Sequence, residues 1–306
     1  MRFIVPILII IFLSVQPYSA FSANSSTKKN STSSKAKASS SKKKGTSTKS
    51  TTPSLNKNDP FPRAAASYLV QVDGKTVWSH NADNRLPIAS ITKIMTALLV
   101  LENCQLDEIV TAGKSVQQET GTRLGLRPGD KMTVRDLLSA ALIKSACDAC
   151  VALADHVGGS ETEFVKMMNK RVSELGLLNT HFQNAAGHDN IENYSTANDV
   201  AALAKTALKN PIFAGTVSIT SKTITTVSGN RKFLLKNTNE MFERVEGIKG
   251  VKTGYTPQAG KCLVSLAERN GTDVLLVLLN SPRRWETADK MLEKALAAAA
   301  IKTAQR

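Results

Sequence analysis

The chain has 306 residues, of which 42% are hydrophobic, and a formal net charge of +15 at pH 7. This length and composition are typical of a globular protein with one large domain or two small ones. Nine lysines and no acidic residue fall within 24–58. The rest of the chain is therefore only mildly basic, and its charge gives no reason to expect specific nucleic-acid binding.

Residues 1–22 are predicted to be a secretory signal peptide. Arg2 supplies a positive charge, and the apolar run over 3–15 is short for a membrane span. Small residues at Ala20 and Ser22 favour cleavage after Ser22. Cleavage after Ala20 or Ala23 and an uncleaved membrane anchor are the alternatives. We therefore expect an exported protein that acts in the periplasm or at the exterior of the cell envelope.

Residues 23–60 are rich in Ser, Thr and Lys and nearly devoid of apolar side chains. Such a segment cannot bury enough apolar surface to offset its chain entropy, so we expect a disordered tether. Its lysines could attract an anionic membrane or anionic wall polymers, and a plain solubilising spacer is the alternative. The remaining residues, 61–306, are predicted to form a single domain.

This domain is predicted to open with a β-hairpin followed by a helix. Strand formers at 66–72 and 75–80 flank the turn dipeptide Asp73-Gly74. The helix is expected from Ser90, because five apolar residues follow it at helical spacing: Ile91, Ile94, Met95, Leu98 and Leu101.

Helices are expected through the middle of the chain and strands toward its end. Capping boxes predict helices that begin at Thr133, Ser160 and Thr196, each with an acidic residue three positions later. Strands are predicted at 217–227, 231–236, 250–255, 262–268 and 273–280, and a final helix from Arg284. Strands at both ends with a helical middle predict an α+β fold in which one antiparallel sheet is built from both ends of the domain.

The cysteines and histidines do not form a recognisable cofactor motif. Four cysteines, namely Cys104, Cys147, Cys150 and Cys262, permit three fully paired disulfide arrangements that the sequence does not rank. The Cys147–Cys150 pair lacks the surrounding pattern of a redox fold. The histidines His80, His156, His181 and His188 show no metal-ligand spacing. We therefore expect no metal and no other cofactor.

Ser90 and Lys93 suggest nucleophilic catalysis. Three residues apart on a helix, a hydroxyl and an amine share one face. A serine hydroxyl needs a base to accept its proton, and a lysine among apolar neighbours can serve when its pKa is lowered. This spacing alone is weak evidence, because 40–43 and 41–44 in the expected tether also match it.

Two further motifs give this pair a context. Ser145-Ala146-Cys147 is expected where two helices meet, and Lys252-Thr253-Gly254 lies on a predicted strand. Lys252 can supply a fixed cation and Thr253 a hydroxyl for a substrate carboxylate, while Gly254 allows a ligand backbone to approach the strand. The backbone amides of Ser90 and Tyr255 are candidates for stabilising an oxyanion.

The three motifs in this order are typical of class A β-lactamases and penicillin-binding proteins. Over about 65–296 the chain resembles the D-alanyl-D-alanine carboxypeptidase and endopeptidase family of low-molecular-weight penicillin-binding proteins. The resemblance extends to the segments at 86–89, 126–131, 194–197 and 250–263. It implies a β-lactamase/DD-peptidase-like fold, with a five-stranded antiparallel sheet, flanking helices and an all-helical subregion.

The resemblance also implies what the site residues do. Ser90 would form an acyl-enzyme with peptidoglycan stem peptides, Lys93 would act as general base and Ser145 would relay a proton to the leaving amine. Lys252 would anchor the substrate carboxylate, with Thr253, Gly254 and Tyr255 beside it. β-Lactam antibiotics would be covalent inhibitors.

Cys147 departs from the family pattern, which usually has asparagine at this substrate-contacting position. A thiol is a weak hydrogen-bond partner, so substrate positioning could be looser. A tolerated substitution is the favoured interpretation, and a penicillin-binding scaffold without turnover is the alternative. A role for the thiol as a second nucleophile is not expected, because the sequence provides no histidine partner for it.

Two choices of activity stay open at this point. A class A β-lactamase needs a glutamate in an ExxLN-like loop, and the nearest match, 174–179, has its asparagine one place too late. The chain ends soon after the helix expected at 284–300, which leaves no room for the additional C-terminal domain of many carboxypeptidases in the family. We therefore expect an endopeptidase that cleaves cross-links, with carboxypeptidase activity as the alternative.

Overall fold

The computed structural model describes residues 59–304, with side chains to residue 301. The expected signal peptide and nearly all of the expected tether lie outside these residues. Among the residues described, no helix is long and apolar enough to cross a membrane.

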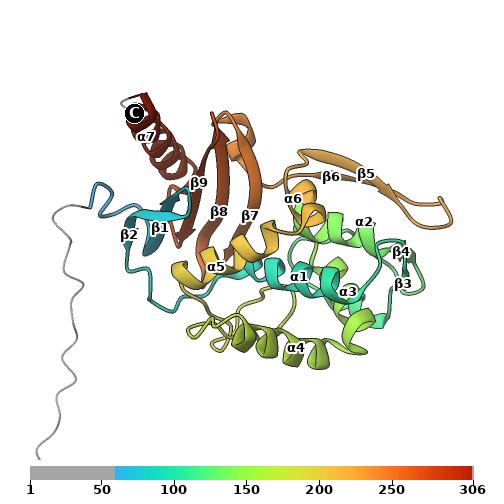
Figure 1. Cartoon of the computed structure of the whole chain (residues 1–306). Helices are drawn as coiled ribbons and strands as arrows, with labels where there is room; N and C mark the ends of the chain where they lie inside the picture. The colour runs from blue at the N-terminus through green and yellow to red at the C-terminus, as the bar shows by residue number, and fades with distance from the viewer. Residues whose placement is uncertain (1–58, 305–306) are drawn as a thin grey trace, which may run out of the picture. The chain divides into compact units, whose positions relative to one another are not determined.

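The centre of the fold is a five-stranded antiparallel sheet (Figure 1). It contains β1 (Ser67–Val72), β2 (Lys75–His80), β7 (Ile248–Thr256), β8 (Gly260–Arg269) and β9 (Thr272–Leu279), in the order β2-β1-β9-β8-β7. The N-terminal hairpin thus pairs with the last strand of the chain, with Leu69 opposite Val277. The predicted sheet built from both ends of the domain is confirmed.

Both faces of this sheet are buried over β1, β7, β8 and β9, whereas the edge strand β2 is largely exposed. Alternate strand residues point to opposite faces, so Tyr68 and Val70 contact one apolar cluster while Leu69 contacts the other. The helix α7 (Arg284–Ala304) covers the first face, and α5 (Ala197–Leu208) covers the second (Figure 1). The predicted final helix therefore packs on the sheet.

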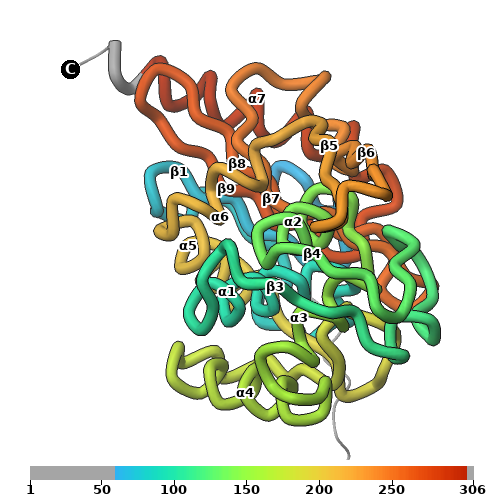
Figure 2. The backbone as a smooth tube through the Cα atoms, turned by 90° about the vertical axis from the view of Figure 1, so that its right-hand side faces the viewer, coloured from blue at the N-terminus to red at the C-terminus, as the bar shows by residue number. Residues whose placement is uncertain are grey.

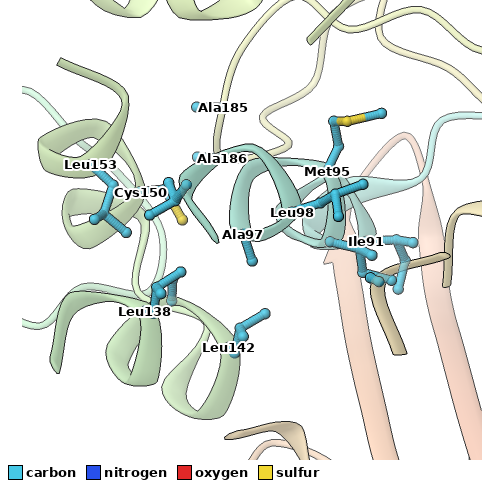
Figure 3. Packing of buried hydrophobic residues seen from close by; sticks show 14 of the residues in the cluster. Ile91, Met95, Ala97, Leu98, Leu138, Leu142, Cys150, Leu153, Ala185 and Ala186 are labelled. Atoms are coloured by element: carbon cyan, nitrogen blue, oxygen red, sulfur yellow. The ribbon is translucent and has the colours of Figure 1, made fainter. Parts of the chain in front are cut away.

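The helical part of the domain contains α1 (Lys93–Asn103), α2 (Val134–Ser139), α3 (Cys147–Gly158) and α4 (Glu161–Glu174). A π-helical turn, η3 (Ala140–Lys144), joins α2 to the loop before α3. Figure 3 shows side chains of α1 facing those of the neighbouring helices, with Ala97, Leu138, Leu142, Cys150 and Leu153 among them. In both overall views α4 lies at the end of the helical part farthest from the sheet (Figure 1, Figure 2).

The three predicted N-caps are confirmed. The hydroxyls of Thr133, Ser160 and Thr196 accept hydrogen bonds from the backbone N–H three residues later, at 3.1, 3.3 and 3.1 Å. They begin α2, α4 and α5 and satisfy one otherwise unpaired N–H at each helix end.

The structure differs from the predicted elements at Ser90 and over 217–227. Ser90 does not begin an α-helix but lies in a 3₁₀ turn, η1 (Ala89–Thr92), and the α-helix starts at Lys93. The strand predicted over 217–227 is shorter, because α6 (Pro211–Val217) occupies its beginning. The Asn210 side chain accepts from the N–H groups of residues 212 and 213, and Pro211 fixes the first helical position.

The rest of that segment forms a separate hairpin of β5 (Ser221–Thr225) and β6 (Lys232–Lys236), which projects from the domain (Figure 1). A second small sheet, β3 (Ile109–Thr111) with β4 (Lys131–Thr133), was not predicted, because strands of three residues show no periodicity. Two short 3₁₀ turns, η2 (Lys114–Gln117) and η4 (Glu240–Glu243), complete the described elements.

Candidate active site

Ser90 and Lys93 lie where the sheet meets the helical part of the domain. The Nζ atom of Lys93 is 2.9 Å from Oγ of Ser90, and the Lys93 side chain is completely buried. Ala89, just before the serine, has a left-handed φ of 49°, a conformation that non-glycine residues adopt at a cost and that is common at functional sites. The 3₁₀ turn thus keeps hydroxyl and amine in contact although it replaces the expected α-helical start.

Two further atoms fix the Lys93 amine. It donates a hydrogen bond of 2.5 Å to the carbonyl oxygen of Ala186 and lies 3.5 Å from Sγ of Cys147. The neighbouring carbonyl of Ala185 accepts from the Thr96 hydroxyl at 2.7 Å, and Figure 3 shows both alanines beside α1. A buried amine held in this way has little freedom to turn away from the serine.

Ser145 and Lys252 form a second serine–lysine pair. Ser145 ends the π-helical turn with a left-handed φ of 64°, and its Oγ accepts a hydrogen bond of 2.9 Å from Nζ of Lys252. The same amine donates to the backbone oxygen of Thr253 at 3.0 Å. Burial and the nearby charge of Lys93 lower the pKa of Lys252 to about 7. The amine of Lys252 thus contacts Ser145, the predicted proton relay, and also the backbone of the strand that we expect to bind substrate.

Strand β7 brings the third motif to the nucleophile. The hydroxyls of Thr253 and Thr238 are 2.6 Å apart, and Tyr255 is 62% exposed. A Cβ atom added at Gly254 would lie only 2.9 Å from the carbonyl oxygen of Ile88 and 3.2 Å from the backbone nitrogen of Ser90. The glycine therefore lets the turn that carries Ser90 approach β7, whereas the sequence suggested that a ligand backbone would need this space.

We predict that Gly254→Ala lowers the second-order rate constant of acylation by labelled penicillin at least tenfold, because the new methyl group separates β7 from the Ser90 turn. Gly215→Ala is the matched control, since a Cβ at Gly215 in α6 meets nothing within 4 Å. Equal rates in both variants would show that the close approach is not needed for acylation. Thermal unfolding of each variant separates this effect from a loss of folded protein.

Arg284 is a residue of the site that the sequence analysis treated only as a helix start. Its Nη1 atom donates to the backbone oxygens of Gly254 at 2.8 Å and Cys262 at 3.1 Å. A guanidinium thus lies under the strand that carries Lys252 and Thr253. Partial burial lowers the pKa of Arg284 without removing its charge near neutral pH. The site therefore contains a permanent cation in addition to the two lysines.

Cys147 lies inside the site with surroundings that the sequence did not reveal. Its thiol is near Lys93, and the ligating atoms of Cys147, Glu119 and His188 all lie within 4.8 Å of one another. A histidine is therefore close to this thiol, contrary to the expectation. However, Nε2 of His188 is 2.7 Å from Oε2 of Glu119, so the ring is already engaged with a carboxylate.

The cysteines form no disulfide, and Glu174 lies on the surface of α4. All four cysteines lie in the described part of the chain and are free thiols, so none of the permitted disulfides is formed. Glu174 ends α4, where its carboxylate pairs with Lys170 and Arg171 on the helix surface. The segment at 174–179 therefore does not provide the glutamate of a β-lactamase loop.

Comparison with known proteins agrees with this geometry. A family model described as D-alanyl-D-alanine carboxypeptidase matches residues 54–283. The D-alanyl-D-alanine carboxypeptidase DacF of Bacillus subtilis is 37% identical over 71% of this chain, and the match spans 57% of that protein's own length. The D-alanyl-D-alanine endopeptidase of Pseudomonas aeruginosa is 35% identical over 71% of this chain and 72% of its own length.

The fold is also similar to that of solved structures. The crystal structure of the Streptomyces K15 DD-transpeptidase superimposes with a TM-score of 0.72 at 37% identity, covering 76% of this chain and 97% of that one. Fold, site geometry and family model thus lead to one conclusion. The chain belongs to the D-alanyl-D-alanine carboxypeptidase family of serine peptidases.

Proposed function

We propose that this protein hydrolyses D-alanyl peptide bonds of peptidoglycan stem peptides through an acyl-enzyme on Ser90, and that its main activity is cleavage of cross-links. The observation that carries the proposal is the 2.9 Å contact between the Ser90 hydroxyl and the buried amine of Lys93. It places a base within reach of the proton that must leave the nucleophile.

The chemistry follows from the two serine–lysine pairs. Oγ of Ser90 attacks the carbonyl carbon of the D-alanine whose peptide bond is cleaved, while Lys93 takes its proton. The peptide C–N bond then breaks, and the leaving amine receives a proton from the Ser145 hydroxyl, which Lys252 can replenish across their 2.9 Å contact. Water then attacks the resulting ester and gives up a proton that restores Lys252, Lys93 returns its proton to Ser90, and the acid is released. A β-lactam ring would open at the same serine and leave the enzyme acylated.

Strand β7 supports binding of an extended peptide. It is the last strand in the order β2-β1-β9-β8-β7, so one edge has no strand partner among the described residues. A stem peptide could add to this edge through backbone hydrogen bonds. Lys252, Thr253 and Arg284 would then face its carboxylate, and the amides of Ser90 and Tyr255 would face the developing oxyanion.

The preference for cross-links rests on the likeness to the Pseudomonas endopeptidase. Trimming of terminal D-alanine is the alternative, favoured by the likeness to the Bacillus carboxypeptidase. A third possibility, a penicillin-binding scaffold without turnover, would follow if Cys147 failed to hold the substrate. Export by a cleaved signal peptide and attraction of the lysine-rich tether to anionic envelope polymers complete the proposal.

The test is mass spectrometry of purified muropeptides incubated with the protein lacking residues 1–22. Conversion of cross-linked dimers to monomers, absent with Ser90→Ala and after penicillin treatment, supports the endopeptidase. Loss of one alanine from pentapeptides alone makes the protein a carboxypeptidase. Acylation by penicillin without conversion of either substrate identifies a scaffold, and no acylation at all contradicts the mechanism.

A further inference from the structure

We propose that Cys147, His188 and Glu119 form a binding site for a zinc-like divalent cation beside the catalytic lysine, and that an occupied site slows acylation of Ser90. The metal-binding part is independent of the proposed function, whereas the inhibitory part rests on it. The sequence contains no metal motif for this site because the three residues come from separate segments, and Glu119 and His188 are 69 positions apart.

The geometry fits a small divalent cation. The ligating atoms lie within 4.8 Å of one another. A tetrahedral zinc ion with bonds of about 2.0 to 2.3 Å holds its ligand atoms about 3.3 to 3.6 Å apart. Side-chain shifts of about an ångström therefore suffice, and the present 2.7 Å contact between His188 and Glu119 would open to admit the ion.

The donor set selects the class of metal. A thiolate, an imidazole and a carboxylate together suit zinc better than the hard cations magnesium and calcium, which prefer oxygen ligands. Three protein ligands leave a fourth position for water, as in open zinc sites. Binding would release the thiol proton of Cys147 to solvent.

His188 is held in place by its own loop. The Asn184 side chain accepts from the backbone N–H groups of Gly187 and His188, at 2.6 and 2.9 Å, and donates to the His188 carbonyl at 3.1 Å. Gly187 has a left-handed φ of 85°, and a Cβ atom there would lie 2.0 Å from the carbonyl oxygen of Ala89. This contact fixes the histidine loop against the Ser90 turn, so less entropy is lost when a ligand binds.

The segment that carries Glu119 is tied to Cys147. The backbone N–H of Cys147 donates to the carbonyl of Thr122 at 2.8 Å. The buried carboxylate of Asp148 accepts from the N–H groups of residues 124, 125 and 126, at 2.8, 2.7 and 2.9 Å. The Glu119 side chain is only 13% exposed and Cys147 only 6%. Two of the three ligands are thus withdrawn from bulk water.

The charges around the site bear on both binding and inhibition. The Glu161 carboxyl group interacts electrostatically with both Glu119 and His188. Sγ of Cys147 lies 3.5 Å from Nζ of Lys93, so a cation bonded to the sulfur would lie within about 6 Å of that amine. It would occupy the side of the cleft where Cys147 is expected to contact substrate, and it would withdraw the thiol from Lys93.

The chain contains a second cluster of the same residue types, which serves as an internal control. Cys104, Glu108 and His156 also bring their ligating atoms within 4.8 Å of one another, and His156 is exposed. Burial and Glu108 raise the pKa of the Cys104 thiol, which disfavours the thiolate that a metal needs. No hydrogen bond or ion pair among the described residues links this cluster to Ser90 or Lys93.

The experiment titrates the chelator-treated, reduced protein with Co²⁺ and records the thiolate-to-cobalt charge-transfer band, which Zn²⁺ should abolish by displacement. We expect one equivalent bound. His188→Gln and Glu119→Gln should weaken binding at least tenfold, and Cys147→Ser should remove the band. Cys104→Ser and His156→Gln should leave band and affinity unchanged. This readout does not depend on catalysis, so it decides the metal site even if Ser90 is never acylated.

The inhibitory part is tested by the acylation rate with labelled penicillin, compared within each variant with and without Zn²⁺. Wild-type protein should be slowed at least tenfold by saturating Zn²⁺ and restored by chelator, whereas His188→Gln should lose this response. Absence of the band, an unchanged affinity for Co²⁺ in both His188→Gln and Glu119→Gln, or loss of the band in Cys104→Ser overturns the site. A cobalt band without any effect of Zn²⁺ on acylation overturns the inhibition.

Discussion

Replacing Lys93 by alanine is expected to slow acylation of Ser90 by penicillin about 10²- to 10⁴-fold, the range in which a positioned general base contributes. The amine is the only nitrogen base that the described structure places within hydrogen-bond distance of the Ser90 hydroxyl. Intact-protein mass spectrometry of the penicillin adduct over time gives the rate constant, and Ser90→Ala should show no adduct.

Lys170→Ala is the matched control, because Lys170 lies on the surface of α4 with its side chain 81% exposed. It should acylate at the wild-type rate. Lys93→Ala leaves the carbonyl of Ala186 without its donor, so the folded fraction of each variant is checked by thermal unfolding. A folded Lys93→Ala protein with an unchanged rate would remove Lys93 from the mechanism.

Lys252→Met is expected to lower kcat/KM for D-alanine-terminated peptides about 100-fold, because it removes the amine that contacts Ser145 and that should face the substrate carboxylate. The same variant should change how stability depends on pH. The folded-state pKa of Lys252 is about 7, against an ordinary value of 10.5. Between these values the unfolded chain binds a proton that the folded protein does not.

Stability of the wild type should therefore rise with pH in this window relative to Lys252→Met, by up to about 1.4 kcal/mol per pH unit. Below about pH 7 Lys252 is protonated in both the folded and the unfolded protein. The difference in unfolding free energy between wild type and Lys252→Met should therefore no longer change with pH. Urea unfolding of the two proteins from pH 6 to 10 measures it, with Lys170→Met as the exposed control. Parallel profiles for wild type and Lys252→Met would show that the amine keeps an ordinary pKa.

The sequence predicted most of the strands and the residues that carry the chemistry, because both have local signals. The spacing of Ser90 and Lys93 places them together whether the turn is α-helical or 3₁₀. The contact between Lys252 and Ser145 could not be predicted from the sequence. The two residues are 107 positions apart, and the order of motifs in a chain does not specify which side chains meet.

The groups that sequence analysis missed depend on register or on distant loops. Arg284 reaches the carbonyls of Gly254 and Cys262, a contact that follows only from the pairing of β7 with β8 and the position of α7. The proximity of His188 to Cys147 depends on the loop of Gly187, which packs against the Ser90 turn, and on the position of α3, which begins at Cys147. By contrast, the helix at 211–217 had a local signal, since Asn210-Pro211 is a good helix start.

The pairing of β1 with β9 also constrains how the protein can be made. The backbone N–H of Asp273 donates to the Asp73 carboxylate across 200 positions in the chain, so the central sheet cannot close before its C-terminal strands have been synthesised. Such long-range pairing slows folding. Lys252 and Thr253 arrive on the same late segment. A chain interrupted before residue 248 therefore has a nucleophile but neither a complete sheet nor a second amine, and we expect no activity until β7, β8 and β9 have been made.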